Sequence, residues 1–114
     1  MPHIILRSSQ NLPPNLNIAE VLAKLVAALA GCDTIDSPSI KAYHQSVETW
    51  VMGAGAREGF VHCEVSLLSG REIPLRQEIS AKLFEVMREE FESLGTVGIT
   101  VEVREMNKES FNKL

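Results

Sequence analysis

Apolar and polar residues alternate with two different periods along the chain, and these periods predict four strands and two helices. Residues 2–7 form a short β-branched and apolar run that predicts a buried strand. Residues 37–47 predict a second strand, with weaker alternation. Residues 60–68 and 97–104 alternate from one side chain to the next, which is typical of half-buried strands.

Two segments between these strands repeat their apolar residues at helical spacing. Asn17 can cap the first helix, and Glu20 completes a capping-box pattern. Gly31 is expected to end this helix in a left-handed conformation. Pro74 suits the first turn of the second helix, and Gly95 follows its last residue. The predicted apolar stripes are Ile18, Val21, Leu22, Leu25, Val26 and Leu29 in the first helix, and Leu75, Ile79, Leu83, Val86, Met87, Phe91 and Leu94 in the second.

The element order is strand–helix–strand followed by strand–helix–strand. It predicts an α+β fold in which two consecutive β-α-β units form a four-stranded mixed sheet with two helices on one face. A helical crossover favours parallel strands within each unit. Residues 50–59 hold three glycines and predict a turn that could join a hairpin. The sheet face without helices has a mixed character, with Ile5, Phe60 and His62 on it, so we expect other subunits to cover it.

Length and composition narrow the class of protein. The 114 residues predict a single domain, 1–114, and the 45% of hydrophobic residues are enough for a core. The net charge is −4 and no Lys/Arg cluster occurs, which argues against a nucleic-acid partner. No apolar stretch reaches about 18 residues, so no membrane partner is expected. Residues 1–10 mix polar and apolar side chains unlike a signal peptide, which predicts a cytoplasmic protein.

Most familiar catalytic patterns are missing from the sequence. The chain has no glycine-rich phosphate loop, no HExxH pattern and no nucleophile elbow. His3, His44 and His62 are scattered without ligand spacing, so neither a metal nor a cofactor is expected. Cys32 and Cys63 lack CxxC spacing and are interpreted as buried thiols, although a disulfide between them stays open.

The start of the chain offers one chemical possibility. Removal of Met1 in front of the small residue Pro2 would leave a secondary amine at the head of a buried strand. Desolvation and nearby cations both favour the neutral form of an amine. A neutral amine at pH 7 can act as a general base.

Several fragments of the sequence resemble one known family. They are residues 2–5, 47–52, 60–62 and 69–71, together with a tail that holds Asn107 and Phe111. In order and spacing they resemble the 5-carboxymethyl-2-hydroxymuconate isomerase family of the tautomerase superfamily. Macrophage migration inhibitory factor and 4-oxalocrotonate tautomerase are relatives of that family.

The resemblance implies a homotrimer with an active site at each subunit boundary. It also implies an isomerase that moves a proton in an unsaturated 2-hydroxy or 2-keto carboxylate, in the breakdown of aromatic compounds. Pro2 matches the family's catalytic proline, and Arg71 matches an arginine that would bind a carboxylate or an oxyanion. Lys41 stands where the family has a second arginine. Lysine keeps the positive charge but lacks the planar guanidinium that binds a carboxylate through two hydrogen bonds. Tyr43 and Trp50 could form an apolar wall for the substrate, although Trp50 could equally be a packing anchor.

Two alternatives remain at this point. If Met1 stays in place, the Pro2 nitrogen is an amide, and the same trimer would be a non-catalytic module that binds a ligand or a partner. A ferredoxin-like RNA-binding domain shares a similar element order. The negative net charge and the lack of paired aromatic residues on a central strand argue against RNA binding.

Overall fold

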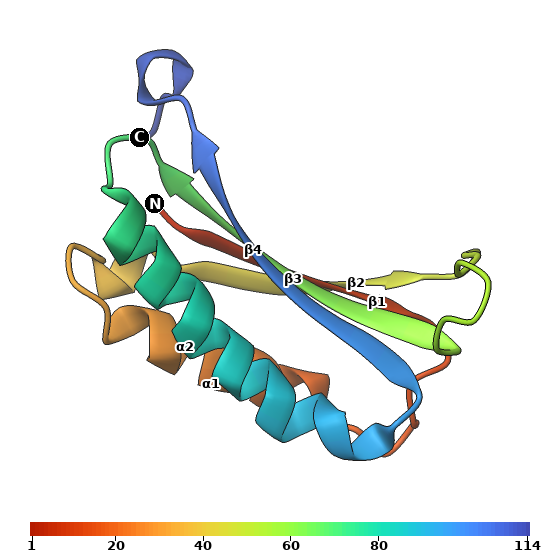
Figure 1. Ribbon diagram of the computed structural model, residues 1–114. Helices are drawn as coiled ribbons and strands as arrows, with labels where there is room; N and C mark the ends of the chain where they lie inside the picture. Colours follow the sequence, from red (N-terminus) through yellow and green to blue (C-terminus); the bar gives the residue numbers. More distant parts are fainter.

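The computed structural model describes all 114 residues and consists of a twisted four-stranded sheet with two helices on one face (Figure 1). In chain order the elements are β1 (His3–Ser9), α1 (Ile18–Ala30), β2 (Lys41–Val47), β3 (Gly59–Leu68), α2 (Ile73–Phe91) and β4 (Val97–Met106). Three short 3₁₀ helices complete the chain: η1 (Ser37–Ser39), η2 (Glu92–Leu94) and η3 (Lys108–Ser110). The predicted α+β arrangement is confirmed.

The sheet order is β2-β1-β3-β4. β1 pairs with β2 in parallel, and β3 pairs with β4 in parallel, because a helix connects the strands of each pair. The two halves meet where β1 and β3 run antiparallel. The hairpin suggested for residues 50–59 is wrong, because β1 lies between β2 and β3 and the two strands joined by this segment do not pair.

One predicted boundary and one predicted glycine conformation differ in the structure for local reasons. The second strand begins at Lys41 rather than at residue 37, because Pro38 lies in the first turn of η1. Gly31 does not take the expected left-handed conformation: its φ is −79°, and its N–H continues the helical bonding to Ala27. Gly95, with φ of 71°, does adopt that conformation after η2.

The core lies between the sheet and the helices. Asn17 caps the start of α1 as expected, because its Oδ1 accepts the Glu20 N–H at 3.1 Å. The innermost residues of α1 are four apart, and those of α2 are four apart as well, so each helix presents one ridge to the sheet. These ridges are Val21, Leu25 and Leu29 in α1, and Ile79, Leu83, Met87 and Phe91 in α2.

The sheet contributes the other half of the core. Alternate residues of β1 and β3 point toward the helices and are fully buried or nearly so: Ile4, Leu6, Val61, Cys63, Val65 and Leu67. The remaining predicted stripe residues pack around this centre as half-buried side chains. Both helical stripes and the alternation of β3 are therefore confirmed.

The sheet face that carries no helix is charged at its centre. Glu64 is 7% exposed. Its carboxylate accepts hydrogen bonds from Arg7 at 3.2 Å and from Ser66 at 3.1 Å, and it lies 3.7 Å from the Arg104 guanidinium. The sequence placed Phe60 and His62 on this face without revealing the ion-paired network across its strands.

The two cysteines belong to the interior. Both are free thiols and both are buried. Burial raises the pKa of the Cys63 thiol to about 12, and burial also raises the pKa of the Cys32 thiol. Neither is suited to act as a nucleophile, because the thiolate is the reactive form. Separately, no helix of the chain combines the length and the apolar character needed to cross a membrane.

We predict that Leu25→Ala destabilises the fold by about 2–5 kcal/mol, because the side chain is fully buried in the α1 ridge and would leave a cavity. The control Val51→Ala removes a side chain that is 94% exposed, and should change stability by less than about 0.5 kcal/mol. Urea unfolding at one fixed protein concentration measures both. Equal effects of the two variants would contradict this description of the core.

We also predict that both thiols resist alkylation in the folded protein at pH 8, reacting about a hundredfold or more slower than in the unfolded chain. The physical reason is the raised pKa of each buried thiol, which leaves little thiolate at that pH. Mass spectrometry after timed exposure to iodoacetamide gives the rates. Rapid modification of Cys63 in the folded protein would show that its environment is open to solvent.

Candidate functional site

The amino terminus lies at one end of the sheet, beside the first residue of β2. His3 is in register with Lys41, and the Lys41 N–H donates to the Pro2 carbonyl at 3.0 Å. Pro2 is buried, whereas Met1 is half-buried. The Met1 amine donates to the Ser39 Oγ at 3.1 Å. The strand pairing thus holds the start of the chain against the segment that enters β2.

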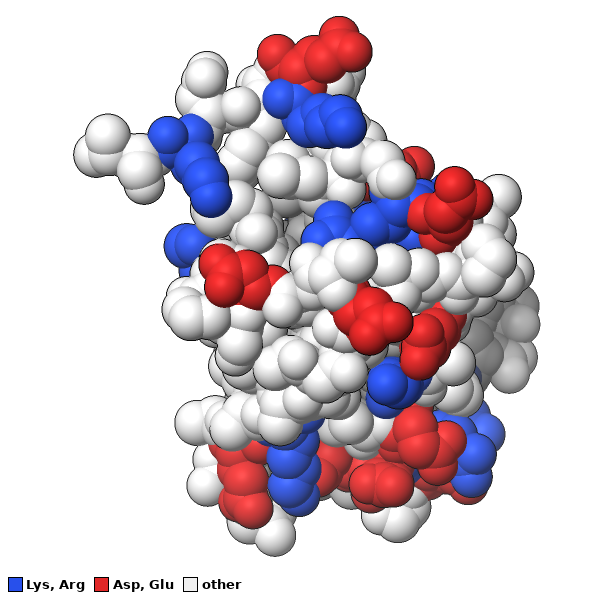
Figure 2. All heavy atoms as spheres, turned by 90° about the vertical axis from the view of Figure 1, so that its left-hand side faces the viewer, with Lys and Arg blue, Asp and Glu red and all other residues white.

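An open pocket of about 460 Å³ surrounds this amine. Its walls come from the amino terminus, from the segment before β2 and from the tail after η3, and both chain ends lie on this side of the molecule (Figure 1). The lining residues are Met1, Asp36, Pro38, Ser39, Lys41, Asn112, Lys113 and Leu114. Figure 2 looks at this side and shows Lys and Arg side chains in its upper half with acidic side chains beside them, and charged side chains of both signs in its lower half as well.

The surroundings favour the neutral form of the amine. Burial lowers the pKa of the Met1 amine below its usual value, and the positive charges of Lys113 and Arg71 lower it further. The carboxylate of Asp36 acts in the opposite direction, and Lys41 adds a smaller lowering effect. More cations than carboxylates thus act on the amine, although the whole chain is acidic.

Arg71 lies near this site without lining the pocket. Its Nε and NH2 groups donate to the side chain and carbonyl of Thr34 at 3.0 and 3.1 Å, and NH1 donates to the Leu68 carbonyl at 3.2 Å. Thr34 has φ of 66°, a conformation that is rare for a β-branched residue. The guanidinium therefore ties the loop after α1 to the end of β3. A guanidinium has five N–H groups, so two remain for a ligand.

Lys41 and Tyr43 lie on the same face of β2, two residues apart. Lys41 is exposed, and its Nζ donates to the Ser39 carbonyl at 3.2 Å. Tyr43 is 41% exposed and in register with Ile5. Of the predicted site residues, Lys41 thus lines the pocket beside the chain start, and Tyr43 follows it along the open face.

Trp50 lies at the opposite end of the sheet. β2 is seven residues long, roughly 20 Å, and Trp50 follows its far end. The indole Nε1 donates to the Glu58 carbonyl at 3.1 Å, which braces the loop between β2 and β3 (Figure 1). Within one chain Trp50 cannot reach Pro2, so any contact with the site would have to come from a neighbouring subunit.

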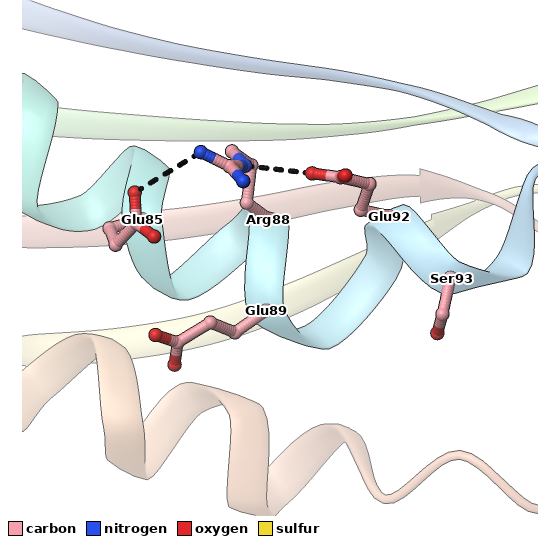
Figure 3. A pocket seen from close by; sticks show the side chains of 5 residues that line it. All are labelled: Glu85, Arg88, Glu89, Glu92 and Ser93. Carbon is pink, nitrogen blue, oxygen red and sulfur yellow. Dashed lines mark hydrogen bonds and ion pairs between the residues drawn. The ribbon is translucent and has the colours of Figure 1, made fainter.

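A second hollow, on the outer side of the last turns of α2, offers no comparable chemistry. Its lining is Glu85, Arg88, Glu89, Glu92 and Ser93, with no apolar residue (Figure 3). Arg88 forms ion pairs with Glu85 at 3.6 Å and with Glu92 at 2.7 Å. These are helix-surface ion pairs of the ordinary kind. No group of three His, Cys, Asp or Glu side chains in the chain is placed to hold a metal ion.

Sequence reasoning missed the residues that the tail brings to the pocket, above all Lys113. The tail is polar and follows the last strand, so no linear pattern places it beside the amino terminus. Ser39 was also missed, because residues 37–47 were interpreted as strand, whereas Ser37–Ser39 form a 3₁₀ turn. Asp36, which directly precedes that turn, was not singled out either.

Comparison with known proteins agrees with the fold. The chain is 28% identical over 95 residues to a 5-carboxymethyl-2-hydroxymuconate Delta-isomerase of Escherichia coli, covering 82% of this chain and 75% of the relative. A 5-carboxymethyl-2-hydroxymuconate isomerase structure from Deinococcus radiodurans R1 superposes with a TM-score of 0.89 at 24% identity, covering 99% of this chain and 88% of the other.

A more distant structure, a fused 4-OT protein described as a symmetric trimer, has the same fold. Its TM-score is 0.70 at 18% identity, over 97% of this chain and 90% of the other. The family model for 5-carboxymethyl-2-hydroxymuconate isomerase matches residues 2–114. The chain therefore belongs to the 5-carboxymethyl-2-hydroxymuconate isomerase family, a family of isomerases.

Proposed function

We propose that this protein is a tautomerase that moves a proton within an unsaturated 2-hydroxy or 2-keto carboxylate, with the Pro2 amine as its general base. The observation that carries the proposal is the chain's amino terminus, which lies in a pocket where burial and nearby cations lower the pKa of the amine. A group with a lowered pKa can accept and return a proton near neutral pH.

The base becomes available when Met1 is removed. The new amine on Pro2 lies one residue further along the chain, at a residue that is buried whereas Met1 is only half-buried. Burial penalises the protonated amine, so the Pro2 amine has reason to be neutral at pH 7. It would take a proton from the hydroxyl or from a carbon of the substrate and return it to another carbon. The reaction needs no oxidant, reductant or cofactor.

Arg71 and Lys41 would bind the negative charges of the substrate. Arg71 has two N–H groups left after its bonds to Thr34 and Leu68, and those bonds hold the guanidinium in place. A preorganised cation of this kind can stabilise a carboxylate or a developing oxyanion. Lys41 has a single backbone acceptor at Ser39, so its ammonium can turn toward a ligand as a point charge.

The substrate class follows the family. The relatives are named for 5-carboxymethyl-2-hydroxymuconate, an unsaturated polycarboxylate, so we infer a related carboxylate that arises in the breakdown of aromatic compounds. We place this reaction in the cytoplasm, where a reducing environment suits two free thiols. No nucleic acid takes part in the proposed reaction.

We further infer a homotrimer, as in the fused 4-OT relative. The open sheet face would pack inside the ring, where the Glu64 network and the exposed Tyr43 would find partners. In this arrangement Tyr43 and a neighbour's Trp50 are candidates for the apolar wall of the site.

A chain that keeps Met1 supports a second candidate function. Its Pro2 nitrogen is an amide, and the half-buried Met1 amine is bound to Ser39. Such a protein would be a ligand-binding trimer without proton-transfer activity. The state of Met1 in the native host separates the two candidates.

We predict that Pro2→Ala lowers kcat by about a hundredfold or more on phenylenolpyruvate or 2-hydroxymuconate, because a primary amine replaces the proline base. Intact mass spectrometry first establishes that Met1 is absent from wild type and variant. The control His3→Gln changes the neighbouring residue and should keep most of the activity. Equal rates for wild type and Pro2→Ala would contradict the proline mechanism.

We predict that the protein sediments at three times its chain mass of 12.6 kDa, and that Thr100→Arg shifts it toward monomer. Thr100 lies on the open sheet face, where an added charge and bulk would be buried in a trimer. The control Ser93→Arg makes the same change of charge beyond α2 and should leave the trimer intact. Analytical ultracentrifugation measures both, and a monomeric wild type would refute the assembly.

A further inference from the structure

We propose that Lys113, on the tail after η3, determines specificity by binding the second carboxylate of a dicarboxylate substrate. The inference rests on the proposed function and adds a residue from the tail to its site. It makes the tail one wall of the active site, with a charge that selects among substrates.

The structure fixes the tail at its base. The Lys108 N–H donates to the Ser69 Oγ at 3.2 Å, and the Asn107 Oδ1 accepts the Glu109 N–H at 2.9 Å. Phe111 is half-buried. The bond to Ser69 attaches η3 to the loop that precedes Arg71, and the bond within η3 holds its first turn. From that base the residues that follow reach the pocket around the amino terminus.

Lys113 adds to the pocket a positive charge that is not paired with another group of the chain. Lys24 and Lys82 on the helices are paired with glutamates, and Lys41 donates to a backbone carbonyl. Lys113 has no such ion pair or hydrogen bond in the structure. An ammonium without a partner, on the wall of an open pocket, is available to a ligand carboxylate.

Lys113 also lines the same pocket as the Met1 amine, which lies one residue before the proposed base Pro2. Among the charges that lower the pKa of the Met1 amine, Lys113 has the largest effect, ahead of Arg71 and Lys41. The only opposing carboxylate among these groups is Asp36. Three cations against one carboxylate leave an excess of positive charge around the amine, which suits a ligand with two negative charges.

The three cations differ in what they can bind. Arg71 is held in place with two N–H groups left, which suits one carboxylate or oxyanion near the reacting carbons. Lys113 lies on the part of the pocket wall that the tail forms, which Arg71 does not line, and it can bind a second carboxylate of the same ligand. A monocarboxylate has no second carboxylate for Lys113 to bind, so this residue should affect the binding of dicarboxylates alone.

The test compares Lys113→Ala, Lys113→Arg and the control Lys24→Ala, all confirmed by mass to lack Met1. Kinetics are measured at a pH at which the amine is neutral in every variant, so that a change in its pKa does not by itself alter turnover. The substrates are 2-hydroxymuconate, a dicarboxylate, and phenylenolpyruvate, a monocarboxylate. We expect Lys113→Ala to raise KM for 2-hydroxymuconate about tenfold, the size of one lost charge-assisted hydrogen bond, with kcat little changed. Phenylenolpyruvate turnover should be nearly unaffected, and Lys113→Arg should restore the dicarboxylate KM.

A second readout does not need turnover. The amine pKa, followed by NMR titration, should rise in Lys113→Ala, and calorimetry should show weaker binding of 2-hydroxymuconate. An equal loss on both substrates, or unchanged KM, amine pKa and binding, would overturn the assignment of Lys113. If wild type turns over neither substrate while the amine titration and the binding still respond to Lys113→Ala, the proposed reaction fails and the binding site stands.

Discussion

The position of β1 between β2 and β3 is the constraint on which the rest of the structure depends. β1 has a parallel partner on one side and an antiparallel partner on the other, so its backbone is bonded along both edges. Its residues Ile4 and Leu6 are fully buried under the helices. Because the strand begins at His3, the start of the chain has no freedom to move away from β2, and Pro2 is buried as a consequence.

The chemistry of the site comes from an uneven distribution of charge. The chain has a net charge of −4, yet the groups that act most strongly on the amine are mainly cationic. Arg71 has both a structural and an electrostatic effect, because it holds Thr34 in a rare conformation and also lowers the pKa of the amine. Under the proposed function, this local excess of cations would attract anionic substrates although the chain as a whole is acidic.

The two faces of the sheet differ in the kind of side chain that they carry. One face buries aliphatic side chains against α1 and α2, which is enough to explain the fold of one chain. The other face carries Glu64 between Arg7 and Arg104, a network that is satisfied within one chain and remains partly open to solvent. Polar networks of this kind can select one geometry of association, because an imperfect partner would leave buried charges unpaired.

The sequence by itself determined the secondary structure and the family. Helical stripes four residues apart and the alternation of β3 are local patterns, and local patterns depend only on which side chains must avoid water. The tertiary structure decided which strands are neighbours, so it excluded the hairpin between β2 and β3, separated Trp50 from Pro2 and brought Lys113 to the amine. These contacts join residues far apart in the chain. No periodic pattern of the sequence predicts them, because they depend on which strands pair and on how the helices pack against the sheet.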